Sequence, residues 1–243
     1  MGKIICCGLG PGDPDLMSVR AAREVRGARH VAFFRKKGHP GQARRIVDGM
    51  LTEGAIEYPM EYPVTTEVAS DSDEYARLLD AFYDGWAARL AELGRHNDVI
   101  VLCEGDPYFY GSFMHLHLRL QGRAEIEVIA GIPGMAGCWN SIGRPIALGD
   151  EVVTVLTGTL GEDDLIRRMR NSDALVIMKT GRNLSKVRRA LQSAGRLADA
   201  WLIERGTMPG ERVARLADVG ETDCPYFAIV LVYGGERRMK AAE

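Results

Sequence analysis

Three glycine-rich stretches in this chain each follow an apolar segment that predicts a β-strand. The first, Gly8 to Ser18, reads Gly-Leu-Gly-Pro-Gly-Asp-Pro-Asp-Leu-Met-Ser and precedes an amphipathic helical pattern. The others are Glu104 to Ser112 and Ala130 to Gly137. Strand-loop-helix junctions of this kind often bind ligands, because glycine permits sharp turns and close backbone approach. Each loop alone is explained as a tight turn, but three in one chain favour a shared binding cleft.

The first loop does not match the phosphate-binding turn of dinucleotide-binding folds. That motif requires glycine or alanine where this chain has Asp13. It also requires an acid at the end of the second strand, where this chain has Phe34 and then Arg35. An NADP-dependent reductase would use Arg35 or Lys36 and remains an alternative. A Walker loop is excluded because neither Gly-Lys-Ser nor Gly-Lys-Thr follows the glycines.

The sulfur and imidazole side chains do not have the spacing of metal ligands. His115 and His117 are two residues apart in a predicted helix and therefore point to different faces. The cysteines are odd in number and are predicted to be reduced, packed thiols: Cys6, Cys7, Cys103, Cys138 and Cys224. We therefore predict no metal site.

Strands and helices alternate along the chain and position these loops. The continuous apolar run 98–103 is typical of a strand buried in a parallel sheet. Two prolines in the segment 59–67 are expected to exclude regular structure there. The predicted strands are 3–7, 30–34, 55–58, 98–103, 125–129, 152–156, 174–178, 200–203, 212–216 and 226–232, the last two as a closing pair, and the predicted helices include 41–50, 73–93, 163–170 and 184–194.

A length of 243 residues favours two lobes, which we place at 1–121 and 122–243. Strands separated by helices predict α/β lobes, each with a mostly parallel, mixed sheet. The composition is that of a soluble globular protein, with 46% hydrophobic and 26% charged residues and a formal net charge of -2. This balance gives no reason to expect a nucleic acid or a membrane as the partner. The absence of a signal-like start or a membrane-length apolar run predicts a cytoplasmic protein.

The loops and several later motifs together resemble the tetrapyrrole methylases, class III enzymes that transfer methyl groups from S-adenosylmethionine to corrin and sirohaem precursors. The opening Gly-x-Gly-Pro-Gly-Asp resembles the first family signature, and Gly105-Asp106-Pro107 with Tyr110-Gly111 resembles the second. The third and later signatures correspond to 131–134, 175–178 and 204–207, so the match runs through nearly the whole chain. The resemblance implies two α/β/α lobes, a cofactor in the cleft between them, and a homodimer.

Three stretches, 61–66, 104–114 and 178–184, resemble the precorrin-2 C(20)-methyltransferase group of this family, which acts in cobalamin (vitamin B12) biosynthesis. The resemblance implies methylation of C(20) of precorrin-2 to give precorrin-3A. Another corrin or sirohaem precursor, or cobalt-loaded factor II, is an alternative substrate. A non-catalytic, ligand-sensing module is the alternative from a different functional class.

The resemblance also implies a set of residues that bind S-adenosylmethionine. Asp106 is expected to accept a charge-assisted hydrogen bond from a ribose hydroxyl or from the cationic end of the cofactor. Its alternative role is to cap a helix that begins at Pro107. Phe34 stands where some relatives have a proton-accepting acid, so no catalytic base is assigned, and Pro133 stands where many have Thr or Ser. The expected cofactor-binding residues are Pro11, Gly105, Asp106, Phe109, Pro133, Gly134, Met178 and Gly206.

The implied substrate carries several carboxylates, which would be bound by cationic side chains. Arg35, Lys36 and Lys37 are the first candidates, and Lys179 and Arg182 are further ones. A solvated basic loop is the alternative for the first three. Among the aromatic residues 108–110, which core packing also explains, we assign Phe109 to the cofactor and Tyr110 to the substrate.

Overall fold

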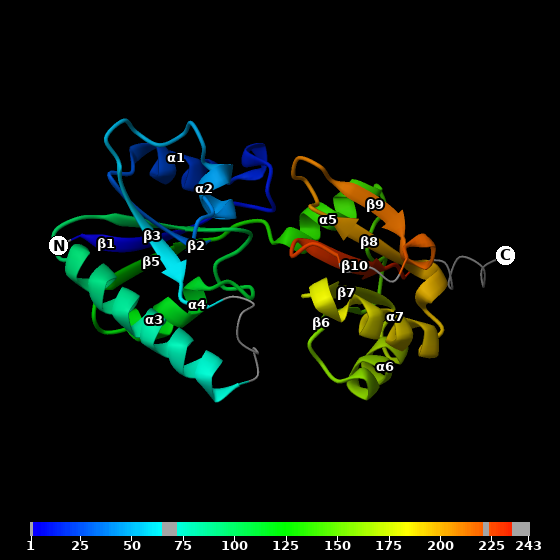
Figure 1. The fold of residues 1–243 in the computed structure, drawn as a ribbon. Helices are drawn as coiled ribbons and strands as arrows, with labels where there is room; N and C mark the ends of the chain where they lie inside the picture. The colour runs from blue at the N-terminus through cyan, green and yellow to red at the C-terminus, as the bar shows by residue number, and fades with distance from the viewer. Residues whose placement is uncertain (1, 65–71, 221–223, 235–243) are drawn as a thin grey trace. The chain divides into compact units, whose positions relative to one another are not determined.

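The computed structural model describes residues 2–64, 72–220 and 224–234, and the chain divides into two compact units, Met1–Gly134 and Met135–Glu243 (Figure 1). Each unit contains a five-stranded sheet. Separate hydrophobic clusters lie on the two faces of each sheet, where helices pack. The predicted α/β class is confirmed.

The first sheet has the order β3-β2-β4-β1-β5, and each neighbouring pair is parallel. All five residues of β4 are buried, as the continuous apolar run predicts. Because every strand points the same way, the loops that follow them emerge at one edge. The strands are β1 (Lys3–Gly8), β2 (His30–Lys36), β3 (Ile56–Tyr62), β4 (Val99–Cys103) and β5 (Glu125–Ile129).

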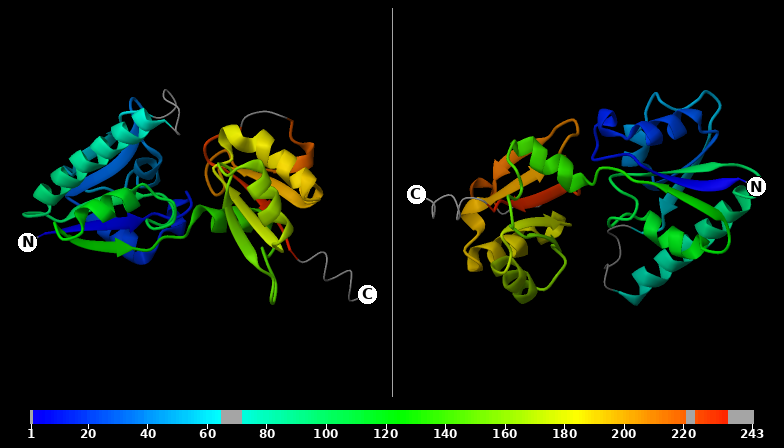
Figure 2. Two further views of the ribbon diagram at one scale, coloured as in Figure 1. Left: turned by 90° about the horizontal axis from the view of Figure 1, so that it is seen from below. Right: turned by 180° about the vertical axis from the view of Figure 1, so that it is seen from behind.

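Helices cover both faces of this sheet. Figure 1 and the right-hand view of Figure 2 show α1 (Val19–Gly27) and α2 (Gln42–Ile46) on one face, with α3 (Asp73–Leu93) and α4 (Phe113–Leu120) on the other. The bounds of α3 match the prediction, and its first turn is capped by the Ser72 hydroxyl, which accepts a hydrogen bond from the Tyr75 N–H at 3.2 Å.

The strand β3 corrects the prediction that the prolines near residue 60 exclude regular structure. Pro59 lies within β3 and is paired with Phe33 of β2. It is accommodated because β3 is an edge strand, where a missing N–H does not interrupt a ladder on both sides. Thr65, Thr66 and Glu67 of the expected irregular segment lie outside the described residues.

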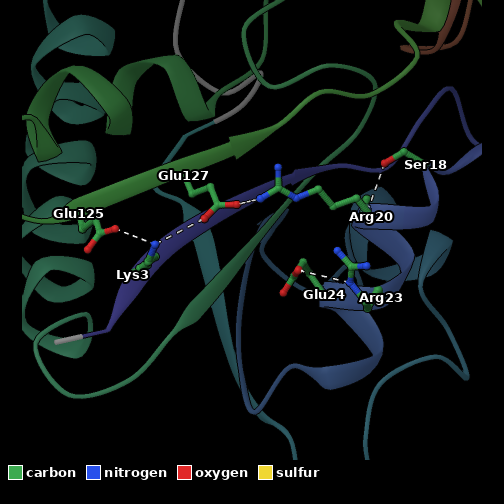
Figure 3. A network of polar contacts seen from close by, with 8 residues as sticks. Lys3, Ser18, Arg20, Arg23, Glu24, Glu125 and Glu127 are labelled. Carbon is green, nitrogen blue, oxygen red and sulfur yellow. Dashed lines mark hydrogen bonds and ion pairs between the residues drawn. The ribbon is translucent and has the colours of Figure 1, made fainter.

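The strand β5 belongs to the first unit, whereas the expected boundary at residue 121 placed it in the second. It pairs with β1, and ion pairs connect its glutamate side chains to β1 and α1 (Figure 3). Lys3 Nζ lies 2.7 Å from Glu125 Oε1, and Glu127 forms an ion pair with Arg20 of α1. Strand pairing is not local in sequence, so the turn at 121–123 resembles a domain boundary although the first unit continues to Gly134.

The second sheet has the order β6-β7-β10-β8-β9, with one parallel and three antiparallel pairs. Three strands, β6, β7 and β8, run in one direction, and β10 lies between β7 and β8 in the opposite direction. The expected closing pair is therefore corrected: β9 pairs with β8, and β10 does not pair with β9. The strands are β6 (Val153–Thr157), β7 (Ala174–Met178), β8 (Ala200–Glu204), β9 (Arg212–Arg215) and β10 (Ala228–Val232).

One helix packs on one face of the second sheet and two pack on the other. The helix α5 (Gly134–Ile142) contributes Cys138 to a cluster with Val176 and Ile203. The helices α6 (Glu162–Arg170) and α7 (Leu184–Ser193) pack on the opposite face through Leu165, Val187 and their neighbours. In the ranges that the structure describes, no helix has both the length and the apolar character needed to cross a membrane.

Candidate functional site

The three glycine-rich loops of the first unit meet at the carboxyl edge of its sheet. The strand β1 lies between β4 and β5, so the loops that follow these three strands are neighbours. The first two loops are joined by an antiparallel bridge in which the Gly105 N–H donates to the Gly10 carbonyl at 2.8 Å. The predicted convergence of the loops is therefore confirmed within this unit.

Two of the glycines allow the loops to contact each other backbone to backbone. A Cβ atom on Gly131 would lie 2.1 Å from the Gly105 carbonyl oxygen, and one on Gly8 would lie 2.5 Å from the Gly131 nitrogen. Neither position accepts a side chain without moving the main chain. Gly8 and Gly131 thus join the loops, which is a packing role that the sequence pattern alone did not separate from ligand binding.

The Asp106 carboxylate links the second loop to the third. Its Oδ2 atom accepts a hydrogen bond from the Gly131 N–H at 3.1 Å, and its Oδ1 atom accepts one from the Tyr108 N–H at 2.9 Å. The helix that follows begins at Phe113 and not at Pro107, so Asp106 caps a turn and does not cap a helix. Each carboxylate oxygen can accept further hydrogen bonds, so a ligand donor can still bind there.

The other expected cofactor residues of the first unit surround this junction. Gly105 has φ of 65°, and the position of its missing Cβ lies 3.5 Å from the Gly134 nitrogen and 3.7 Å from Pro133 Cα. Pro11 follows the bridging Gly10 and is buried. Phe109 is half-buried in the second loop and packs edge-on against Tyr110, with ring centroids 5.0 Å apart.

The structure adds a second group of side chains at the same edge, which the sequence did not predict. The Tyr62 hydroxyl, at the end of β3, forms a hydrogen bond with the Ser112 hydroxyl. The Tyr62 ring stacks on Phe34 at 5.6 Å, and burial raises the pKa of Tyr62. Phe34 is therefore a packed core residue at the position where some relatives are expected to have a proton-accepting acid.

The basic segment at the carboxyl end of β2 is partly neutralised by an ion pair. Parallel pairing of β2 with β3 places Arg35 beside Glu61, and Arg35 donates to Glu61 Oε1 from Nε at 3.0 Å and from Nη2 at 2.6 Å. Lys36 and Lys37 follow and are exposed. Arg35 therefore already forms an ion pair, and the two lysines present the exposed positive charge of this segment.

Glu104 is a carboxylic acid at the end of β4 whose role the sequence did not reveal. Its Oε1 atom accepts a hydrogen bond from the Ala43 N–H of α2 at 3.0 Å. Burial raises the pKa of this carboxyl group, and the hydrogen bonds to backbone N–H groups partly oppose that effect. Glu104 therefore links the second loop to α2.

In the second unit, Met178 is the last residue of β7 and Gly206 lies in the loop after β8, and these two strands run in the same direction. Met178 ends β7, and its carbonyl accepts a hydrogen bond from the Gly158 N–H at 2.7 Å. Gly206 lies so close to α5 that an added Cβ atom would lie 2.6 Å from Cys138 Sγ. Burial raises the pKa of the Cys138 thiol to about 12, which fits the predicted inert, packed thiol.

A carboxylate also holds the loop that contains Gly206. Glu211 Oε2 accepts hydrogen bonds from the Thr207 N–H at 2.6 Å and from the Ser141 hydroxyl of α5 at 2.7 Å. This contact joins residues that are 70 positions apart. The sequence did not predict the contact between Ser141 and Glu211, because neither of these two residues belongs to a recognisable motif.

The histidines and cysteines behave as ordinary side chains. His115 stacks on Tyr83 at 4.6 Å, whereas His117 contacts Tyr108 through a hydrogen bond of 3.0 Å. The two histidines therefore have different partners, as their spacing predicts. Within the described part of the chain, no group of three or more His, Cys, Asp or Glu side chains has the arrangement of a metal site.

Comparisons with known proteins agree on one family. Residues 3–220 match the model of the Tetrapyrrole (Corrin/Porphyrin) Methylases. A Sinorhizobium protein named precorrin-2 C(20)-methyltransferase is 46% identical over 239 residues, which cover 98% of each chain. A Salmonella typhimurium protein named cobalt-precorrin-2 C(20)-methyltransferase is 27% identical and covers 95% of this chain and 96% of its own.

A solved structure has the same fold. The uroporphyrin-III C-methyl transferase from Thermus thermophilus, in complex with S-adenyl homocysteine, has a TM-score of 0.62 and 23% sequence identity. The alignment covers 98% of this chain and 100% of that one. At this identity the likeness describes the fold.

Proposed function

We propose that this chain, which belongs to the tetrapyrrole (corrin/porphyrin) methylase family, transfers a methyl group from S-adenosylmethionine to C(20) of precorrin-2 to give precorrin-3A. The observation that carries the proposal is the 46% identity to a precorrin-2 C(20)-methyltransferase over 98% of both chains. This reaction belongs to the biosynthesis of cobalamin, a corrin.

S-adenosylmethionine supplies an activated methyl group on a sulfonium. A carbon–carbon bond forms as the carbon–sulfur bond breaks, S-adenosylhomocysteine leaves, and the methylated carbon then loses a proton. The chain's residues therefore need to align the reacting atoms and exclude water, and alignment of this kind lowers a barrier by about 7–11 kcal/mol. An electron-rich bridging carbon needs no strong base for its attack, and no residue is assigned as one.

We assign cofactor binding to Pro11, Gly105, Asp106, Phe109, Pro133, Gly134, Met178 and Gly206. Their chemistry fits this cofactor. The Asp106 carboxylate retains acceptor capacity for hydroxyl or ammonium donors, and Gly105 leaves the nearby backbone without a covering side chain. We assign substrate binding to Arg35, Lys36, Lys37 and Tyr110, in which the exposed lysines supply charge for carboxylates.

The experiment that tests this proposal is incubation of the purified chain with S-adenosylmethionine and precorrin-2. Mass spectrometry should show the gain of one methyl group, and NMR with a ¹³C-labelled donor should locate it at C(20). A parallel reaction with the cobalt-containing substrate tests the alternative that the Salmonella relative's name suggests. Methylation at another carbon, or of the cobalt form alone, would replace our assignment of the substrate.

Calorimetry separates methyl transfer from the two remaining alternatives. S-adenosylhomocysteine should bind with micromolar affinity, whereas NADP should not bind. NADP binding alone would favour a reductase that uses the first loop. Binding of S-adenosylhomocysteine without turnover of any tetrapyrrole would favour a ligand-sensing module.

We also propose that the protein is a cytoplasmic homodimer. All five cysteines are buried thiols outside any disulfide, which is usual in a reducing compartment. The dimer rests on the family resemblance. Sedimentation equilibrium tests it, because a dimer would have twice the chain mass of 26.7 kDa.

A further inference from the structure

Four non-glycine residues of the described chain have a left-handed backbone conformation. They are Tyr110, Lys179, Arg205 and Thr207, with φ of 56°, 54°, 52° and 63°. Each follows the carboxyl end of a strand: Tyr110 in the loop after β4, Lys179 directly after β7, and the other two after β8. This conformation is unfavourable for residues with a Cβ atom and concentrates at functional sites.

Two of these residues are exposed cations at one edge of the second sheet. Lys179 and Arg205 each come immediately after a strand, and β7 and β8 run in the same direction on either side of β10. Neighbouring strands are about 4.8 Å apart, so the two backbone positions are separated by about 10 Å. The backbone positions of these two exposed cations are therefore within the span of one ligand that carries several carboxylate groups.

The surrounding backbone holds Lys179 in its conformation. The Gly158 N–H donates to the preceding carbonyl, that of Met178, at 2.7 Å. A Cβ atom on Gly158 would lie 3.0 Å from the Lys179 carbonyl oxygen, so the two main chains are in close contact. The next residue, Thr180, is fully buried and donates its hydroxyl hydrogen to the Ala228 carbonyl at 3.0 Å.

Arg205 is held in the same way. Its N–H donates to the Phe227 carbonyl at 2.7 Å, and its own carbonyl accepts from the Met208 N–H at 2.9 Å. The following residue, Gly206, is packed against Cys138 of α5. The conformations of Lys179 and Arg205 are therefore imposed by fixed neighbours on both sides.

Glycine would adopt both conformations without strain, and this chain uses glycine at many other left-handed positions. The presence of long cationic side chains at two strained positions therefore points to a function of the side chains. We propose that Lys179 and Arg205 bind carboxylate groups of the bound ligands, Arg205 by the paired hydrogen bonds that a guanidinium forms. This inference rests on the proposed function, which supplies two sources of carboxylates: the tetrapyrrole substituents and the amino-acid end of the cofactor.

The test compares glycine and alanine at each position in the full-length chain. The variants are Lys179→Gly, Lys179→Ala, Arg205→Gly and Arg205→Ala. The control is Arg168→Ala, which removes an exposed cation from α6 near the opposite end of β7. All four variants remove the charge, but only glycine relieves the strain. Each glycine variant should therefore melt about 2–4 °C above its alanine counterpart.

Binding of three ligands then identifies the source of the carboxylate. If the bound carboxylate belongs to the tetrapyrrole macrocycle, all four variants raise the KM for precorrin-2 about tenfold and leave the affinity for S-adenosylhomocysteine unchanged. If it belongs to the cofactor, they weaken S-adenosylhomocysteine about tenfold but leave methylthioadenosine, which lacks the carboxylate, unaffected. Either result supports the inference, provided that Arg168→Ala behaves as wild type.

The inference and the proposed function can fail separately. If the wild-type chain does not methylate precorrin-2, the proposed function fails, while the melting temperatures and S-adenosylhomocysteine affinities still test the inference. Changes below twofold for every ligand in all four variants would overturn carboxylate binding. Glycine variants that melt below their alanine counterparts would overturn the argument from strain.

Discussion

The Asp106 carboxylate and the Gly131 backbone N–H form a hydrogen bond of 3.1 Å that joins two strand-end loops of the first unit. The same carboxylate accepts from Tyr108 N–H, so the loop geometry and the proposed cofactor contact depend on one side chain. Asp13, in the first loop, instead accepts a hydrogen bond from the Asp15 N–H within its own turn. The two acids therefore have different expected roles.

Asp106→Ala should weaken binding of S-adenosylhomocysteine about 10- to 100-fold, because hydrogen bonds to a charged group contribute about 1.5–3 kcal/mol. Asp13→Ala should change the affinity less than threefold, a factor that corresponds to roughly 0.7 kcal/mol. Titration calorimetry measures both. Asp106→Asn keeps an acceptor oxygen and should have an intermediate effect. The opposite ranking of Asp106 and Asp13 would assign cofactor binding to the first loop.

Gly131→Ala should destabilise the fold by about 3 kcal/mol, because the new methyl group would collide with the Gly105 carbonyl. Gly134→Ala is the matched control. Gly134 is the first residue of α5, and an added Cβ atom there has no neighbour within 4 Å. It should be neutral or stabilising by up to about 1 kcal/mol. Urea unfolding measures both. An unchanged unfolding midpoint for Gly131→Ala would contradict the close loop packing.

Local patterns predicted the elements, but pairing partners needed the structure. The bounds of α3 follow from its apolar period and its Ser72 cap, and the burial of β4 follows from its continuous apolar run. The place of Pro59 within a strand is not predictable locally, because nothing in the nearby sequence shows that β3 is an edge strand. The insertion of β10 between β7 and β8 is equally a consequence of long-range packing.

The same division applies to the candidate site. The glycine loops and Asp106 belong to motifs with recognisable spacing, so the sequence located them. The hydrogen bonds between Tyr62 and Ser112 and between Thr207 and Glu211 did not follow from the motifs, because a motif does not show which side chains will meet in the fold. The ion pair of Arg35 with Glu61 depends on the register of two strands that are joined through α2.

Charge reversal in the basic segment tests substrate binding. The double variant Lys36→Glu and Lys37→Glu should raise the KM for precorrin-2 at least about tenfold, which corresponds to roughly 1.4 kcal/mol, and leave S-adenosylhomocysteine affinity unchanged. Arg35 is left intact because its replacement would also leave Glu61 without its partner. The same experiment can then be repeated with Arg35→Glu added.

The matched control reverses two exposed charges near the amino end of the same strand, Arg26→Glu and Arg29→Glu. It changes the net charge equally, so it reports the general electrostatic effect. A rise in KM that is confined to the lysine variant supports the proposal that Lys36 and Lys37 bind carboxylate groups of the substrate. Equal KM values in wild type and the lysine variant would identify the segment as a solvated loop.

The pH dependence of stability tests the burial of Glu104. Burial raises its pKa in the folded state above the usual value, so the folded chain binds more protons at this group than the unfolded chain does. Stability contributed by this group must therefore fall as pH rises from the unfolded pKa to the folded pKa, and then stay constant. The variant Glu104→Gln tests this expectation, because it removes the titration and keeps an oxygen that can accept from the Ala43 N–H.

The free energy of unfolding of this variant, relative to that of the wild type, should increase with pH between the unfolded and folded pKa values of Glu104. Urea unfolding at a series of pH values measures it. A difference that is independent of pH would show that the Glu104 carboxyl group titrates equally in both states and is not desolvated by folding.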